Sequence, residues 1–510
     1  MAAGLTGISE MASKNLLRPP HLKRLLLALT AGTAAVVIYL TAEHFQVVPA
    51  TAALNDEVSG PRALSDRAIA VIPTGDDETG AFSHGVALEL IRLLVRVPEL
   101  EVIAPRSAFA YAAARRAPGK PSLSLDAAWF LEVRSKPEGV DMLWWASLRP
   151  AGSNEPAWVL EERRPAGEAS AFIDAVLARL AGQFGIEVPD EPSALHGVLP
   201  STWRDYFTAW ALQGGGAEGL EEAGRLLEGI LQAKPEWAPA LAADAHNLLL
   251  QAAARGPDRG QLVESAKSRL EKAQAVQPDL AETYLYRSLI AHRFEWDWQQ
   301  AYASAHDALE RAPGDAEVLA TASTAAFTLG RFEEGAEQLR QAIALDPLVL
   351  SHRLKYGLML EFAGHHQAAI DAYRELMVID PDHPGVHAYL GRTLVILDRT
   401  EAGYRHAQLE KAPFWRRYAT LLALYALGRR EEADDTLEAM IADHGFEAAV
   451  QIAEIHAFAG RPDEAFEWLA LAVEQRDPGL ASLLGNPLFE GLDDDPRWPE
   501  LLDTLDLVNE

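Results

Sequence analysis

The chain contains no cysteine and has a deficit of basic residues. Its 510 residues include 45 Lys and Arg against 74 Asp and Glu, which gives a formal net charge of -29. The absence of cysteine excludes disulfides, thiolate metal sites, cysteine nucleophiles and lipid-modified cysteines. Nucleic-acid binding requires clustered Lys and Arg to neutralise phosphates, so the acidic balance argues against DNA and RNA as partners.

Motifs for familiar catalytic chemistry are also missing. The sequence has no HExxH zinc motif, no phosphate loop ending in Gly-Lys-Ser/Thr, and no Gly-x-Ser-x-Gly. The acidic residues in 75–78 are interpreted as a solvated loop rather than a calcium site, because they do not form a ladder of ligands. The pairs His365 with His366 and His383 with His387 are interpreted as surface or packing residues. We therefore expect no enzyme activity, no catalytic residues, no cofactor and no metal.

One long uncharged stretch lies near the amino terminus. Residues 25–42 read LLLALTAGTAAVVIYLTA, which is long enough for a helix to cross a bilayer. The preceding residues 1–24 carry four basic side chains, and the positive-inside rule then places them in the cytoplasm. This predicts a single-pass inner-membrane protein whose later domains lie in the periplasm. A cleaved signal peptide with a site in 50–53 is the alternative, although the apolar run exceeds the roughly 7–15 residues of a signal core; a buried soluble helix is a third reading.

A small α/β domain is predicted after a linker over 43–65. Within residues 66–187, short β-branched runs alternate with helical patterns, which indicates a mixed sheet. The expected strands are 68–74, 100–104, 128–134, 142–149 and 157–163, and the expected helices are 83–97, 106–116 and 168–184.

From residue 201 onward the sequence repeats itself. Five prolines recur at spacings of 43, 35, 34 and 34 residues: Pro235, Pro278, Pro313, Pro347 and Pro381. A small residue lies 12 positions before each of them, and a second residue, mostly large and apolar, lies four positions after that small residue. The small residues are Ala223, Ala266, Ala301, Gly335 and Ala369, and the second residues are Leu227, Leu270, Ala305, Leu339 and Tyr373. This period is typical of tetratricopeptide repeats (TPRs), in which each repeat is a pair of helices.

The repeats extend to about residue 480 and are followed by an acidic end. Gly357 and Gly391 mark the same period, and weaker small-to-large steps continue to Leu469, which predicts about eight helical hairpins between 201 and 478. The solenoid is assigned to 201–480. Residues 481–510 are expected to form an acidic cap with one helix that covers the last apolar face.

These motifs resemble a known bacterial family. DRAIAVIP (66–73), FSHG (82–85) and VRVPELEVIAPRSAFAY (95–111) resemble the TolB-like domain that precedes a TPR array in many signalling proteins. The repeats, including FEWDWQQA and NPLFEGLDDDPRWPELL (486–502), look like the array of those proteins. The resemblance implies the sensor and adaptor half of winged-helix regulators and class III adenylate cyclases, because residues 1–24 are too short for either output domain.

The array itself is the predicted functional surface. Stacked hairpins form a groove whose inner wall comes from the first helix of each pair, and such grooves bind extended peptides or partner helices. Projection of the repeat onto that wall gives six exposed polar candidates for partner binding: Glu282, His292, Arg293, Glu317, Glu361 and Arg392. We therefore predict a non-enzymatic, membrane-anchored scaffold with a protein partner. The alternative is a sensory or regulatory component whose output domain lies on another chain; the oligomeric state stays open.

The stretch FEWDWQQA carries a separate prediction. On the repeat period it spans the turn between two helices, where the spacing of 35 indicates one extra residue. Trp296 and Trp298 are expected to fill that turn, and Asp297 to cap the following helix. The alternative is an aromatic cage for a cationic ligand.

Overall fold

The computed structural model describes residues 63–75, 80–116, 124–138, 140–188, 197–255, 259–445 and 447–507. The predicted cytoplasmic segment, the predicted transmembrane helix 25–42 and nearly all of the linker lie outside those residues. No helix in the described part is long and apolar enough to span a membrane.

The first part of the chain is a five-stranded mixed sheet with helices. The strands are β1 Ala68–Pro73, β2 Glu101–Val102, β3 Trp129–Glu138, β4 Asp141–Pro150 and β5 Trp158–Pro165, in the order β2-β1-β3-β4-β5. Strand β1 is parallel to β2 and β3, whereas β3, β4 and β5 form an antiparallel meander. The helices are α4 Gly80–Leu94, α5 Pro105–Arg116 and α6 Ala169–Phe184, with a 3₁₀ turn η2 Ala166–Glu168. The predicted mixed sheet is confirmed.

Apolar side chains explain this arrangement. All six residues of β1 are buried, as expected for a strand that is covered on both faces. On one face the indole of Trp144, which is fully buried, stacks on Phe172 of α6 with ring centroids 5.7 Å apart. On the other face α5 packs beside the ring of Phe130, which stacks on Tyr111.

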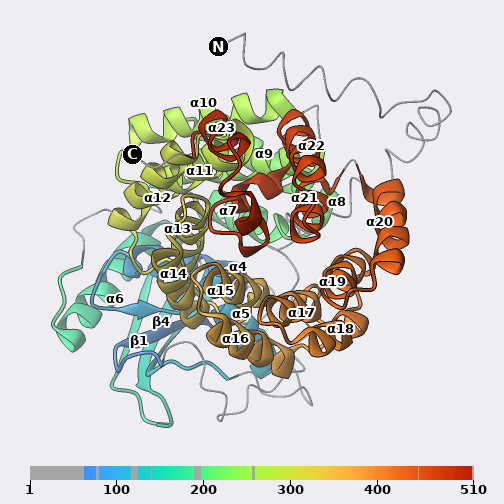
Figure 1. Cartoon of the computed structure of the whole chain (residues 1–510). Coiled ribbons are helices and arrows are strands. Elements are labelled where there is room, and N and C mark those ends of the chain that lie inside the picture. The colour runs from blue at the N-terminus through green and yellow to red at the C-terminus, as the bar shows by residue number, and fades with distance from the viewer. Residues whose placement is uncertain are drawn as a thin grey trace.

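Sixteen helices then form eight antiparallel pairs in the described residues from 200 to 475. They are α7 Pro200–Leu212, α8 Gly216–Ala233, α9 Ala238–Arg255, α10 Gly260–Val276, α11 Ala281–Ile290, α12 Trp298–Arg311, α13 Ala316–Thr328, α14 Phe332–Leu345, α15 Leu350–Phe362, α16 His366–Ile379, α17 Val386–Ile396, α18 Thr400–Leu409, α19 Pro413–Ala426, α20 Arg430–His444, α21 Ala449–Phe458 and α22 Pro462–Gln475. Each odd-numbered helix packs on the next, and successive pairs stack into a curved array (Figure 1). This agrees with the predicted number of hairpins.

The repeated residues lie where the helices of a pair touch. The five small residues and the five that follow them by one turn are all buried. At Gly357 a Cβ atom would collide with the ring of Tyr373 in the partner helix, so only glycine permits this approach. Each repeat proline stands two residues after a second helix ends, where its missing N–H removes nothing from the helix.

The first helix of several pairs ends on a residue with positive φ. Gly330, Gly364, Gly428 and Gly460 occupy this position, with φ between 71° and 78°, and the residue that follows each donates its N–H back into the helix. Trp296 lies 34 residues before Gly330 and adopts the same conformation, with φ 64°. A π-helical turn, η4 Ala291–Glu295, precedes it and absorbs the extra residue that the spacing of 35 indicated.

The C-terminal segment, residues 477–507, returns to the array. It contains the 3₁₀ turns η5 Pro478–Ser482 and η6 Pro487–Leu492 and the predicted helix, α23 Arg497–Thr504. Phe489 and Trp498 belong to an apolar cluster that also contains Trp298 and Leu329, nearly two hundred residues earlier. The array therefore curves round until its end contacts α12 and α13, and the dark red segment lies inside the curve (Figure 1).

Candidate functional site

The inner wall, defined as the surface made by the first helices α7 to α21 of the pairs, is the candidate site. Its amino-terminal half is covered by the α/β domain. The backbone N–H of Ala104 donates to the carbonyl of Leu345 at 2.9 Å, and that of Gly314 donates to Val95 at 2.9 Å. The hydroxyl of Ser107 donates to the carboxylate of Asp346 at 2.5 Å in a buried position. The α/β domain is therefore docked by backbone and side-chain hydrogen bonds onto the turns between successive pairs.

Two of the predicted partner-binding acids face this docked domain. Burial raises the pKa of Glu282, while Arg92 of α4 acts in the opposite direction. Burial, and then the nearby Asp315, raises the pKa of Glu317 to about 7, against the influence of Arg106 of α5. Both acids are only partly exposed. Their charged neighbours come from the chain's own α/β domain.

His292 and Arg293 lie deeper along the wall, and both are partly buried. The Nε2 atom of His292 is 2.9 Å from the hydroxyl of Thr328 on the next first helix. Burial lowers the pKa of His292 to about 4, and the charges of Arg293 and Lys355 add to the effect. This imidazole is neutral at pH 7 and joins adjacent repeats.

Glu361 and Arg392 are buried, so the prediction that they are exposed is wrong. Their side chains are 0% and 3% exposed, and Arg392 Nη2 is 3.3 Å from Glu361 Oε1. Burial raises the pKa of Glu361, and Arg392 and the hydroxyl of Thr393 oppose that shift. Burial disfavours the charge of Arg392, but Glu361 and its neighbours more than offset this and hold its pKa above the ordinary value.

Asn486 of the C-terminal segment completes this buried network. Its Oδ1 accepts from Arg392 Nη2 at 2.9 Å, and its Nδ2 donates to Glu454 Oε1 at 2.7 Å. The other oxygen of Glu454 accepts from the hydroxyl of Tyr418 at 2.7 Å. Burial raises the pKa of Tyr418, and Glu454 adds to that shift, so the phenol stays protonated and can donate. One amide thus links charged side chains of α17 and α21.

Apolar contacts hold the same segment on both sides of Asn486. Leu488 packs in the cluster formed by α17, α19, α20 and α21. A Cβ atom at Gly485 would collide with the ring of Phe332, so the backbone passes directly over that ring. The carboxylate of Asp477 accepts from the backbone N–H of Val450 at 3.2 Å. The carboxyl-terminal half of the wall is therefore occupied by a strand of turns from the chain's own end.

The tryptophan pair lies where the array closes. Trp296 stacks on Trp298 with centroids 5.7 Å apart, and the Arg476 guanidinium lies 5.6 Å from the Trp296 ring. Asp297 accepts from the backbone N–H of Gln300 at 2.9 Å, which confirms the predicted cap. Trp298 is buried as predicted. The cation that Trp296 holds here is an arginine of the last helix pair.

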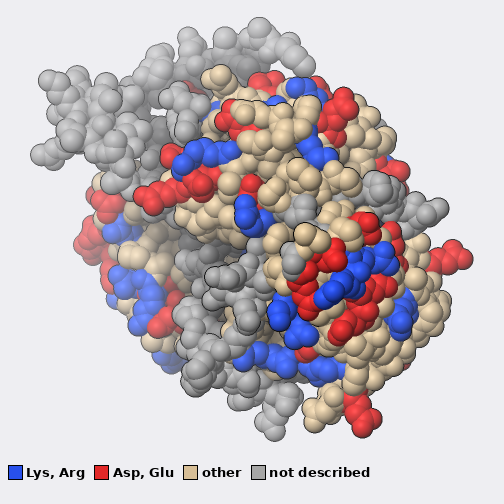
Figure 2. All heavy atoms as spheres, turned by 180° about the vertical axis from the view of Figure 1, so that it is seen from behind, with Lys and Arg blue, Asp and Glu red and all other residues tan. Residues whose placement is uncertain are grey.

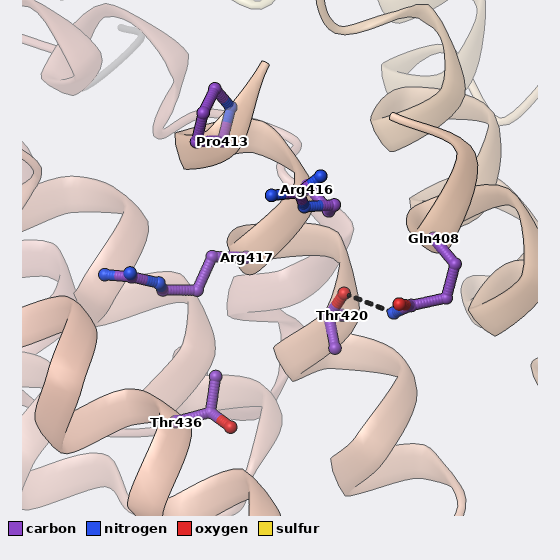
Figure 3. A pocket seen from close by; sticks show the side chains of 6 residues that line it. All are labelled: Gln408, Pro413, Arg416, Arg417, Thr420 and Thr436. Carbon is purple, nitrogen blue, oxygen red and sulfur yellow. Dashed lines mark hydrogen bonds between the residues drawn. The ribbon is translucent and has the colours of Figure 1, made fainter. Parts of the chain in front are cut away.

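The hollows on the described surface are small and polar. One of about 220 Å³ lies between α18, α19 and α20, and in it Gln408 donates to Thr420 at 3.0 Å (Figure 3). Arg417, at its rim, pairs with Asp443 at 2.8 Å. A second of about 290 Å³ is lined partly by the ion pair of Lys267 with Glu295. Neither brings together groups suited to catalysis.

Metal-binding clusters and basic surfaces give no further candidate. No group of three or more His, Asp or Glu able to hold a metal occurs in the described residues. The acidic loop lies largely outside them, and the Nδ1 atoms of His387 and His406 are 3.1 Å apart in a stacked pair. On the face seen in Figure 2, basic and acidic side chains are interspersed.

Sequence reasoning missed the residues that fill the wall. Asn486, Glu454 and Ser107 belong to segments that lie far from their partners along the chain. The available signal was that NPLFEGLDDDPRW carries two apolar anchors and a turn-forming Asn-Pro, which is more than a simple cap needs.

The fold and the wall define a class of protein: a small α/β domain joined to a TPR-type helical array whose inner wall is covered by the same chain. No protein-family model matches the sequence, and no curated protein matches it. Solved structures with a similar arrangement include PilF of Pseudomonas aeruginosa, at 15% identity and a TM-score of 0.34 over 43% of this chain and 96% of that chain. Yeast Tom70 aligns at 15% identity and a TM-score of 0.36 over 66% and 77%. Aspartyl phosphate phosphatase F of Bacillus subtilis aligns at 13% and 0.36 over 61% and 90%. These scores are low, and nothing below depends on them.

Proposed function

We propose that the protein is a non-enzymatic scaffold that binds a protein partner through its helical array. The observation that supports this is the occupied inner wall, because it already holds two segments of polypeptide through hydrogen bonds, charges and apolar contacts. A surface that binds its own chain in this way has the chemistry to bind another.

The membrane anchor is part of the proposal and comes from the sequence. Residues 25–42 would place the array in the periplasm of a bacterial cell, tethered by the linker. The TolB-like resemblance favours a second candidate, a sensory component whose output domain is carried by another chain. A partner that contacts residues 1–24 would favour the sensory component, whereas a partner confined to the periplasm would favour the scaffold.

Photo-crosslinking in intact membranes tests the scaffold function. A photoreactive amino acid is placed in the full chain at Leu409 or Val378, which are exposed large apolar residues of the array, and at Val140 of the α/β domain as the control. We expect one discrete protein adduct from the array positions and none from Val140. Recovery of the chain in the soluble fraction, or identical adducts from all three positions, would contradict the proposal.

A further inference from the structure

The C-terminal segment occupies the wall as a bound peptide does. Between Asp477 and Asp495 it forms only 3₁₀ turns, and its links to the array are side-chain contacts and single hydrogen bonds. The eight helix pairs end at Gln475, before the segment begins. Leaving the wall would therefore break no helix pair.

The chemistry beneath the segment is selective. Glu361, Arg392 and Glu454 are at most 5% exposed, and the amide of Asn486 donates to one of these charges and accepts from another. An amide does both at once, whereas a carboxylate only accepts and an ammonium only donates. Buried charged groups that lose such a partner pay a desolvation penalty, so an emptied wall favours a replacement amide over water.

Backbone geometry adds a second requirement. Asn486 Oδ1 also accepts from the backbone N–H of Leu488 at 3.1 Å, which closes a turn at Pro487. This turn directs Leu488 into one apolar cluster and Phe489 into another. Recognition thus reads an amide, a proline and two apolar residues in sequence.

We propose that the C-terminal segment is a tethered competitor, and that the carboxyl-terminal half of the inner wall binds an extended segment of a partner protein that carries Asn-Pro followed by two apolar residues. This rests on the proposed function and names the kind of partner. The tether gives the chain's own segment an effective concentration in the millimolar range, so a partner binds when that segment is weakened or the partner makes additional contacts.

A labelled peptide of residues 477–496 is the probe, measured by fluorescence anisotropy with two full-length chains. Asn486→Ala weakens the tethered segment and leaves the wall unchanged. We expect the peptide to bind the N486A chain at least tenfold more tightly than the unmodified chain, and the same peptide with Ala at position 486 to lose that gain. Thr504→Ala, an exposed change in the same segment, is the matched control and should behave as the unmodified chain. Equal binding of both peptides to a folded N486A chain would overturn the proposal.

A second variant covers the case in which N486A does not fold. The chain has no cysteine, and a Cβ built at Gly330 lies 3.7 Å from Leu484 Cβ, within disulfide range. The double variant Gly330→Cys, Leu484→Cys is compared with itself, oxidised and reduced. With excess peptide, hydrogen exchange in 485–492 should be faster in the reduced form only. Identical exchange in both forms overturns the proposal.

Two further outcomes separate the inference from the proposed function. A complex of two chains, detected by size-exclusion chromatography when N486A is mixed with the unmodified protein, would assign the wall to a second copy and overturn the inference. A partner that crosslinks to Leu409 while no peptide binds would leave the scaffold function intact and remove only the inference.

Discussion

The two halves of the inner wall are covered in different ways. The amino-terminal half carries a folded domain, and its contacts are backbone hydrogen bonds together with partly exposed charges such as Glu282 and Glu317. The carboxyl-terminal half carries a segment without regular structure, and its central contacts are charges removed from solvent around Arg392. The first cover is held by a folded unit with its own core, whereas the second depends on a few side chains. Single substitutions should therefore affect the second half more strongly.

The largest effect is expected from Arg392→Ala. It leaves Glu361 and Glu454 buried without their countercharge and removes the donor to Asn486. Breaking a buried pair in this way costs about 3–5 kcal/mol. Denaturant unfolding of the full chain measures it. Arg374→Ala is the control, since its pair with Asp371 is exposed and is worth about 0–1 kcal/mol; similar losses for the two variants would contradict the buried network.

Ser107→Ala tests the amino-terminal half and should have a smaller effect. It removes the hydrogen bond that joins α5 to Asp346 and leaves a buried acceptor, at a cost of about 1–3 kcal/mol. Hydrogen exchange of the Ala104 amide, which bonds across the same contact, should accelerate. Thr208→Ala, at an exposed hydroxyl of α7, should change neither quantity. A global loss without faster exchange at Ala104 would locate the effect elsewhere.

A pH dependence should distinguish the same half. Glu317 has a pKa raised to about 7 by burial, whereas its value in the unfolded chain is about 4.5. The folded state therefore holds a proton that the unfolded state has lost, and this group's contribution to stability falls as pH rises from about 4.5 to 7.

Glu317→Gln removes that loss. We expect the variant to gain about 2 kcal/mol over the unmodified chain at pH 7.5 and to match it near pH 4, as measured by urea unfolding at each pH. Glu333→Gln, at an exposed position of α14, should show no such divergence. A constant difference between Glu317→Gln and the unmodified chain at every pH would rule out the titration.

The smallest effect concerns the closure of the array at Trp296. Asp398 occupies the same repeat position with φ 58° and is exposed, so Asp398→Gly should relieve backbone strain and stabilise the chain by about 1 kcal/mol. Trp296→Gly gains the same relief but loses the stack on Trp298 and the contact with Arg476. We expect its net change to be near zero or slightly unfavourable. A gain equal to that of Asp398→Gly would mean that the tryptophan contributes nothing to closure.

Much of the array could be predicted because its code is local. A small residue at Ala301 or Gly335 and a proline two residues past each helix have meaning within a single hairpin, so period and hairpin number follow from spacing. The order of elements in the α/β domain was also predictable from alternation. By contrast, the exposure of Glu361 and Arg392 was predicted wrongly, because projection onto a repeat shows which wall a residue faces but not what covers that wall.

The sequence by itself determined the helix pairs, the mixed sheet and the position of the Trp-Asp-Trp turn, since each depends on residues a few positions apart. Only the tertiary structure decided that the array curves far enough to bring Trp298 against Phe489, and that Asn486 enters the network of Arg392 and Glu454. The curvature is a sum of small rotations over eight pairs, and no single repeat encodes it. Contacts between residues separated by nearly two hundred positions follow from that sum, which is why the occupied wall emerged from the fold rather than from any motif.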